Sequence, residues 1–412
     1  MAADQPAARF ATWLLRPYLD LGASHSGPLH AQAVEHGWTA FEDGAAWFHP
    51  QRALPPAFRV QLAQEAPPAY DITDPRDLPE SLRTKRWQAL CEAIDAWNDL
   101  PDARRCRLAS LLHSMCLYRT VLALVPGGPV TESASLQGHE LAWWRASAEY
   151  MLGLTTRTAQ YHHADLSVFE ALALQVQGAG PTAFNASVRV FVHKAKTGAS
   201  IATLTSWRTH LEKALAAVTP GVDAFTAGLL ASRFHRAVAF LPQRRGDREA
   251  VVCAMAQAER LARALTPVTP PHAMLYRENL HAVIESRTKE ALWLGDLDHA
   301  LVRAEAVLAV DPHDAKAWVE AGQVRFRRKE WREAARAYAV AATLGPPATA
   351  VARHMTAVCL RELGDDALAA LLFKDTLEID ALGISPREEI ARLPDEAVLE
   401  ALKHWSRTTV EW

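Results

Sequence analysis

From about residue 80 onward, apolar residues recur at spacings of three and four, which is the period of one face of an α-helix. In the segment 79–100 such a face would be formed by Trp87, Leu90, Ile94 and Trp97. The following segment, 101–128, begins with a proline and ends at Pro126 and two glycines, residues that are common at helix starts and beyond helix ends. The pattern predicts an all-α chain of successive helices.

Strand and helix compete in one stretch, residues 187–192 (SVRVFV), where Val188, Val190 and Val192 alternate as in a strand. The same stretch also fits a helix, whose apolar face would carry Phe184, Val188, Phe191 and Ala195. Gly198 follows where such a helix would end. We therefore predict a helix here.

The first 50 residues differ from the rest of the chain. Two short helical patterns are followed by residues 37–50 (GWTAFEDGAAWFHP), in which bulky and small residues alternate around Asp43 and Gly44. A glycine in a short loop between two such runs predicts a β-hairpin. Prolines then cluster up to residue 79, and each removes a backbone donor and disfavours helix at the residue before it. This part of the chain is expected to be a connector.

Three segments between residues 281 and 381 repeat similar residue types with a period of 34 and then 35 residues. The turn before each second helix would hold Gly295, Lys329 and Gly364. In the second helix the close-packing positions would be Ala300, Ala334 and Ala369, followed four residues later by Ala304, Tyr338 and Phe373. The units would close at Pro312, Pro346 and Ala381. A fixed period of this length predicts stacked helix pairs.

This period and pattern resemble the tetratricopeptide repeat (TPR) family, which places Trp, Leu-Gly and Tyr on the first helix of a pair and Ala, Phe and Pro on the second. The middle unit matches best, through Trp318, Ala321, Gly322, Ala334, Tyr338 and Pro346. It departs at Arg325, where an aromatic residue is usual. The flanking units keep the second helix but depart on the first, at Ile284, Thr288, Arg353 and Ala357. Trp318 is expected in the core, where its replacement by Ala would cost about 3 to 5 kcal/mol.

The resemblance implies an α-solenoid of stacked antiparallel helix pairs, with a small mixed N-terminal segment that contains the hairpin. The expected regions are an N-terminal segment at 1–50, a Pro-rich connector at 51–79, a helical region at 80–180, divergent TPR-like pairs at 181–280, TPR repeats at 281–381, and C-terminal capping helices at 382–412. The last region is indicated by Ser385, Pro386 and Glu388, a capping-box arrangement at a helix start.

The resemblance also places the first helix of every pair on the concave face, so that equivalent positions form rows. These rows are Glu285, Val319 and His354; Lys289, Gln323 and Val358; Leu292, Phe326 and Arg361; and Trp293, Arg327 and Glu362, with Lys316 and Glu320 beside the centre. The partner-binding candidates are Lys289, Trp293, Lys316, Gln323, Phe326, Arg327, His354 and Arg361. Cationic and aromatic side chains suit a peptide with acidic and apolar residues. For each candidate the alternative is an ordinary solvated or self-packed surface.

The family's carboxylate clamp uses Lys or Arg and Asn at set positions of the first helix. Val319 and Gln323 stand at those positions, which argues against the capture of a chaperone's acidic C-terminal tail. Trp331, at the start of the next helix, is expected to pack against its neighbours and not to bind a ligand.

Composition narrows the class of protein without naming a partner. The net charge of -3 gives no general attraction to nucleic acid or to an anionic membrane. Five scattered cysteines without a Cys-x-x-Cys pair favour reduced thiols over a disulfide framework. The sequence shows no signal-peptide pattern and no apolar run of about 18 residues. We expect a cytoplasmic protein of bacterial type that does not associate with membranes.

Reactive groups do not form a recognised catalytic pattern. The sequence has no phosphate-binding glycine loop, zinc-protease helix, nucleophile elbow or calcium loop. Histidines are frequent near the N-terminus, at His25, His30, His36 and His49, and acid–histidine clusters occur at His139-Glu140 and at His162, His163 and Asp165. None shows the four-residue spacing that brings two metal ligands onto one helical face. No catalytic residue, metal or cofactor is therefore assigned.

The leading interpretation is a non-enzymatic scaffold or adaptor that binds a protein or peptide partner. One alternative is an enzyme or accessory subunit of a biosynthetic or modification pathway, with a pocket between the N-terminal segment and the helical array that involves His36, His49 or His139. Another is a peptide-sensing regulator, but the helix of residues 29–36 that would enter DNA carries no Arg or Lys, so nucleic acid is not the expected partner. The oligomeric state is open, and a homo-oligomer is among the alternatives.

Overall fold

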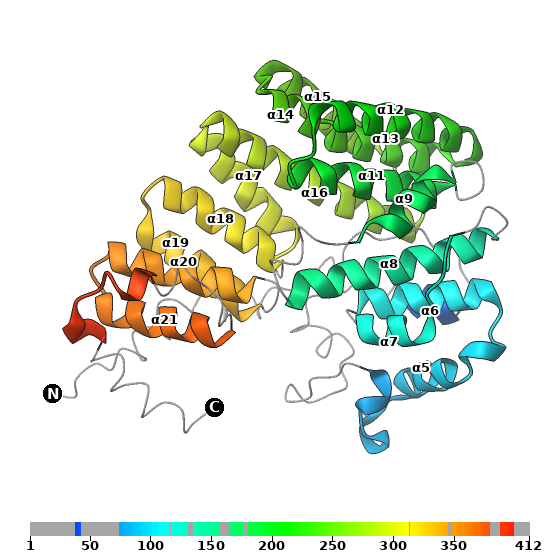
Figure 1. Ribbon diagram of the computed structural model, residues 1–412, viewed down its shortest axis with the longest axis horizontal. Coiled ribbons are helices and arrows are strands. Elements are labelled where there is room, and N and C mark those ends of the chain that lie inside the picture. Colours follow the sequence, from blue (N-terminus) through cyan, green and yellow to red (C-terminus); the bar gives the residue numbers. More distant parts are fainter. Residues whose placement is uncertain are drawn as a thin grey trace. The chain divides into compact units, whose positions relative to one another are not determined.

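The computed structural model describes residues 38–42, 74–115, 117–130, 135–156, 165–175, 180–312, 314–344, 348–379 and 388–398. All regular elements in these ranges are helices, and no strand occurs in them. The chain divides into two compact units, one of residues 29–290 and one of residues 1–28 together with 291–412. The division falls inside helix α16 (Pro270–Leu294), and each unit is described by itself below (Figure 1).

The unit of residues 29–290 begins, in its described part, with a helical turn at residues 38–42. Its next helices are α5 (Lys85–Asp95), α6 (Asp102–Ser114), α7 (Tyr118–Leu124) and α8 (Leu136–Thr156), with short 3-10 turns at Pro75–Asp77, Glu80–Leu82 and Trp97–Asp99. Helix α8 packs against both α6 and α7. The predicted apolar face of residues 79–100 is confirmed, because Trp87, Leu90, Ile94 and Trp97 are all buried.

The predicted hairpin is not formed where its first strand would lie. Residues 38–42 are helical, and residues 43–50 lie outside the described part of the chain. A helical turn places Trp38 and Phe41 on the same side, three residues apart, and both rings are buried. The guanidinium of Arg86 lies 5.0 Å from the Trp38 ring centroid and that of Arg104 lies 5.2 Å from Phe41. The aromatic pair is thus held against α5 and α6, as a packing surface and not as a strand.

The rest of the described part of this unit is also helical. Its helices are α9 (Ser167–Leu174), α11 (Pro181–Lys196), α12 (Ile201–Val218), α13 (Ala224–Val238), α14 (Phe240–Arg245), α15 (Arg248–Ala264) and α16, with a 3-10 turn at Thr219–Gly221. Helix α11 packs on α9 and α12, and α13 packs on α15. Ser200, Asp223 and Asp247 cap α12, α13 and α15 by accepting a hydrogen bond from a backbone N–H of the first turn.

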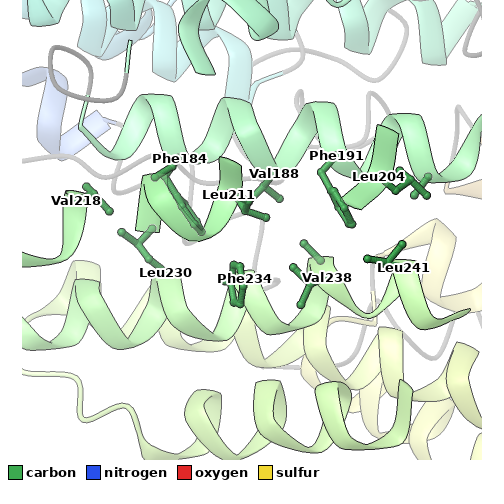
Figure 2. Packing of buried hydrophobic residues seen from close by; sticks show 13 residues of the cluster. Phe184, Val188, Phe191, Leu204, Leu211, Val218, Leu230, Phe234, Val238 and Leu241 are labelled. Atoms are coloured by element: carbon green, nitrogen blue, oxygen red, sulfur yellow. The ribbon is translucent and has the colours of Figure 1, made fainter. Parts of the chain in front are cut away.

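The ambiguous stretch SVRVFV is helical, as predicted, within α11. Its predicted apolar face, Phe184, Val188, Phe191 and Ala195, belongs to one buried cluster with residues of α12, α13 and α14 (Figure 2). Gly198 follows the helix with a φ of 86°, a left-handed conformation that suits glycine. The helix prevails because its period of 3.6 buries these four side chains together, whereas a strand would divide its side chains between two faces.

The second unit, in its described part, contains the end of α16 and five further helices. These are α17 (Leu297–Val310), α18 (Ala315–Arg327), α19 (Trp331–Thr343), α20 (Thr349–Glu362) and α21 (Asp366–Ile379). Each of α17 to α20 packs against the helix that follows it (Figure 1). This succession of neighbouring helices is the stacked arrangement that the 34-residue period predicts.

The turn before each second helix has the same backbone conformation in all three repeats. Gly295, Lys329 and Gly364 have φ angles of 85°, 61° and 81°. Among the described residues, Lys329 is the non-glycine residue with positive φ. The left-handed position is therefore a property of the repeat and not of glycine alone.

The close-packing positions of the repeat are also confirmed. Ala300, Ala334 and Ala369 are completely buried, and Ala304, Tyr338 and Phe373 are at most 1% exposed. In the middle repeat, α18 approaches α19 at Gly322, where an added Cβ would lie 2.8 Å from Cε1 of Tyr338. Only a residue without a side chain allows this approach.

Trp318 does not occupy the fully buried position that the repeat pattern predicts. It is half-buried, and its indole Nε1 donates a hydrogen bond of 2.7 Å to the carbonyl oxygen of Pro312. The ring therefore ties the start of α18 to the loop that leaves α17. Because an indole N–H seeks an acceptor, the side chain lies where one end can reach a loop carbonyl.

Candidate functional site

The exposed face of α18 carries three of the predicted partner-binding residues. Lys316, Gln323 and Arg327 are exposed and are separated by seven and four residues, so they lie along one side of the helix. The other sides of α18 are packed, since Ala317, Ala321, Gly322 and Val324 are buried. We call Lys316, Gln323 and Arg327 the α18 stripe.

The C-terminal end of the stripe lies beside the end of α16. One guanidinium nitrogen of Arg327 (Nη1) donates a hydrogen bond of 3.2 Å to the carbonyl oxygen of Leu292. Lys and Arg at a helix C-terminus are favourable partners for the last carbonyl groups. The next residue, Trp293, is half-buried and belongs to the same unit as the stripe. This hydrogen bond orients Arg327 and uses one of its N–H donors, whereas a guanidinium has five.

Phe326 is a packing residue. It is half-buried, and its ring meets Trp331 in an edge-to-face contact with 5.0 Å between centroids. It packs against two buried clusters, one around Ala334 and Tyr338 and one formed by α20, α21 and Leu393. The prediction that Trp331 packs is confirmed by the same contact.

His354, on α20, is half-buried, and its ring lies 5.4 Å from that of Phe373. Burial lowers the pKa of His354 below its usual value, and the nearby charge of Arg361 lowers it further. The imidazole is consequently neutral at pH 7. The ring therefore carries no positive charge, and its Nδ1 atom is buried.

Arg361, at the end of α20, has carboxylate partners within the chain. Its guanidinium forms ion pairs with Glu362, at 2.9 Å, and with Glu389. Glu389 lies in the C-terminal segment, where residues 388–390 are helical and Leu393 is buried in the cluster with α20 and α21. Arg361 therefore holds the C-terminal segment in place.

The role of Glu389 was missed by the sequence interpretation, which assigned this region only as a cap. The sequence indicates a helix start after Ser385, but Arg361 and Glu389 are 28 positions apart, so their pairing is not predictable from the sequence. The sequence predicts a partner with acidic and apolar residues. In the Arg361–Glu389 pair, an acidic side chain next to apolar residues of the same chain binds to Arg361.

Several positions of the predicted rows are packed and not open. Val319 packs against the cluster around Tyr338, while Leu292 and Val358 are 7% and 9% exposed. These side chains are covered because each repeat buries part of its first helix against the next repeat. The rows that contain Val319, Leu292 and Val358 are therefore interrupted by packed side chains, whereas Trp293, Arg327 and Glu362 of the fourth row are half-buried or exposed.

Lys289 belongs to the other unit, where it forms an i,i+4 ion pair of 2.6 Å with Glu285. Glu285 is 8% exposed, so this member of the first predicted row is also buried. The Lys289 ammonium group thus already has a carboxylate partner on its own helix.

The acid–histidine cluster at residues 139 and 140 lies inside the helical core. His139 is 1% exposed, and Glu140 accepts a hydrogen bond of 3.3 Å from the indole nitrogen of Trp144. Burial raises the pKa of Glu140 above its usual value, partly offset by this hydrogen bond, by one from Cys106 and by the charge of Arg107. Glu140 is half-buried, and its carboxyl group is held by contacts within the helical packing.

A hydroxyl–imidazole pair occurs nearby, with Ser147 Oγ 2.9 Å from His113 Nε2. Both residues are buried, at 2% and 4% exposure, and the imidazole packs against the rings of Tyr118 and Trp144. Such surroundings are typical of a structural hydrogen bond in a core. The N-terminal histidines His25, His30, His36 and His49, and the pair His162 and His163, lie outside the described residues.

Within the ranges that the structure describes, no group of three or more His, Cys, Asp or Glu side chains is arranged to hold a metal ion. No helix in those ranges is sufficiently long and apolar to cross a membrane.

Comparisons with known proteins give remote matches in structure. No family model matches the sequence, and no curated protein matches it. A solved structure of a monomeric IFIT1 mutant with m7Gppp-AAAA is 12% identical over 79% of this chain and 70% of its own, with a TM-score of 0.46. The APC/C hetero-tetramer Cut9-Hcn1 is 11% identical over 99% of this chain and 94% of its own, with a TM-score of 0.25. The helix contacts of this chain itself therefore define its fold.

Proposed function

We propose that the chain is a helical-repeat scaffold that binds a protein or peptide partner, and that the α18 stripe is part of the binding surface. The observation that carries this proposal is the separation of faces on α18. The helix is packed on its apolar and small residues, while two cations and one amide, Lys316, Gln323 and Arg327, remain exposed in line.

The chemistry of the stripe favours a partner with acidic side chains next to apolar ones. Lys and Arg bind carboxylates by charge-assisted hydrogen bonds, and Arg327 is oriented by the Leu292 carbonyl before a ligand arrives. Trp293, which follows Leu292 and is half-buried, supplies aromatic surface in the same unit. The Arg361–Glu389 pair supports this choice, because it joins an acidic and apolar segment to the neighbouring first helix, α20.

A peptide-display selection on the full chain tests the proposal. We expect the selected peptides to be rich in Asp or Glu flanked by apolar residues, and to lose binding by at least about tenfold when Lys316→Glu and Arg327→Glu are combined. The matched control combines Lys329→Glu and Arg332→Glu, two exposed cations, one in the turn between α18 and α19 and one in the first turn of α19. Selected peptides without acidic residues, or equal losses in both double variants, would contradict the assignment of the stripe. Thermal unfolding of each variant shows whether the fold is kept.

A further inference from the structure

Arg189, on α11, is surrounded by three aromatic rings from two other helices. Its guanidinium carbon lies 4.8 Å from the ring centroid of Tyr150 and 5.9 Å from those of Trp143 and Phe169. Distances up to about 6 Å allow a cation–π attraction. The three rings are between 1% and 7% exposed, whereas Arg189 is half-buried. We call the rings of Trp143, Tyr150 and Phe169 the aromatic wall. Arg189 packs against this wall and is partly exposed to solvent.

The aromatic wall is held rigidly. Phe169 meets Trp143 edge to face at 5.3 Å between centroids and meets Tyr150 in the same manner at 6.2 Å. The hydroxyl of Tyr150 lies 3.3 Å from Nδ1 of His193, one turn after Arg189 on α11. Because the rings contact one another, the guanidinium lies among side chains whose own positions are restrained.

Arg189 differs from other half-buried arginines of the same unit in its hydrogen bonding. Their guanidinium groups donate to backbone carbonyl oxygens: Arg83 to Leu78 at 2.7 Å, Arg105 to Trp97 at 3.0 Å, and Arg145 to Leu122 at 2.9 Å. In the described ranges, Arg189 contacts rings and has no hydrogen-bond acceptor or ion-pair partner. Its in-plane N–H donors are therefore available at the solvent side.

Acidic groups on the helices around Arg189 are already engaged. Glu149 pairs with Arg145 at 3.0 Å, Glu170 pairs with Lys194 at 2.8 Å, and Glu140 accepts from Trp144. Helix α11 itself has no acidic residue. In the described structure, no carboxylate of α8, α9 or α11 forms an ion pair with the Arg189 guanidinium.

We propose that Arg189 is a preorganised oxyanion-binding site that takes a carboxylate or phosphate group through two parallel N–H donors. A guanidinium whose faces lie against aromatic rings keeps its edge for bidentate binding. The rings remove the conformational freedom that a surface arginine would lose on binding. This site is independent of the α18 stripe, since it lies in the unit of residues 29–290.

NMR of the full chain labelled with ¹⁵N at the arginine Nε atoms tests the site. The Arg189 signal is the one that disappears in Arg189→Lys. We expect it to shift saturably with inorganic phosphate or with acetate at millimolar concentration, and not with chloride at the same ionic strength. The two titrations distinguish phosphate from carboxylate as the preferred group.

Arg189→Lys keeps the positive charge but not the bidentate geometry, so the affinity for the anion should fall by at least about tenfold, measured by calorimetry. The control is Arg208→Lys, an exposed arginine on α12 that pairs with Glu212, which should leave the affinity unchanged. Absence of a saturable shift of the wild-type signal with both anions overturns the proposal. Equal affinity in wild-type and Arg189→Lys protein overturns it as well.

Discussion

Gly322 of α18 lies directly over the ring of Tyr338 on α19, so closely that a Cβ on Gly322 would be 2.8 Å from Cε1 and 2.9 Å from Cδ1. The Tyr338 side chain is 1% exposed and packs in the cluster with Ala334, Ala335 and Cys359. The ring therefore has no open space into which it can move. The small residue and the large one form a single packing unit of the middle repeat.

We expect Gly322→Ala to lower the free energy of unfolding by about 1 to 3 kcal/mol, because the added methyl group overpacks a buried contact. Chemical denaturation measures the change. Gly221→Ala is the matched control, since an added Cβ there meets nothing within 4 Å. Combining Gly322→Ala with Tyr338→Leu should cost less than the sum of the single changes, and simple additivity would show that the ring contact is not the cause.

Lys329→Gly should raise the free energy of unfolding by about 0.5 to 1 kcal/mol. Lys329 has a φ of 61°, and a left-handed conformation is unfavourable for residues with a Cβ. Lys329→Ala is the control, which keeps the Cβ and should change stability little. The reverse change at the equivalent turns, Gly295→Ala or Gly364→Ala, should be destabilising. A stabilisation by alanine equal to that by glycine would point to the lysine charge instead.

Glu140→Gln should stabilise the protein at neutral pH. Burial raises the folded-state pKa of Glu140 above the ordinary value of 4.5, so the folded state holds the proton more tightly than the unfolded state. The stabilising contribution is complete below about pH 4.5 and is lost as the pH rises through the folded-state pKa. Unfolding measured from pH 4 to 8 should show a smaller decline in the variant. Glu149→Gln, an exposed residue of the same helix, should leave the decline as it is.

Glu278→Ala should destabilise the protein by about 3 to 5 kcal/mol. Glu278 and Arg233 are 3% and 1% exposed, with Arg233 Nη2 at 3.6 Å from Glu278 Oε2. Desolvation lowers the pKa of Arg233 to about 10, although Glu278 opposes the shift, so a guanidinium left without this carboxylate is costly. Replacing both partners by Arg233→Met and Glu278→Leu should cost less, as measured by denaturation. A double variant as unstable as the single one would contradict this account.

Much of the fold was predictable because local packing rules act within one repeat. The left-handed turns at Gly295, Lys329 and Gly364 and the buried positions Ala300, Ala334 and Ala369 follow from a period that the sequence displays. The helix of SVRVFV followed from the four apolar residues of its face. The hairpin prediction was wrong over residues 38–42, because alternation in so short a stretch does not distinguish a strand from a helical turn.

The candidate site was predicted only in part. Lys316, Gln323 and Arg327 are exposed together, as the helix period requires. The pattern predicts that Phe326 binds a ligand, but its ring packs on Trp331 and on the buried cluster of α20 and α21. The pattern also predicts a fully buried Trp318, but this half-buried side chain donates a hydrogen bond to the Pro312 carbonyl oxygen. Contacts of this kind depend on the distances between helices and loops, which the helical period does not contain.

The sequence by itself determined the helices, the repeat and the small-to-large contact at Gly322 and Tyr338, because periodic burial and steric fit are encoded within about 35 residues. The tertiary structure decided which polar groups remain available. Arg361 is held by Glu389, Arg327 is oriented by the Leu292 carbonyl, and Arg189 lies against rings from α8 and α9. The physical reason is that a charge binds whichever group folding brings near it, and that neighbour is often distant in sequence.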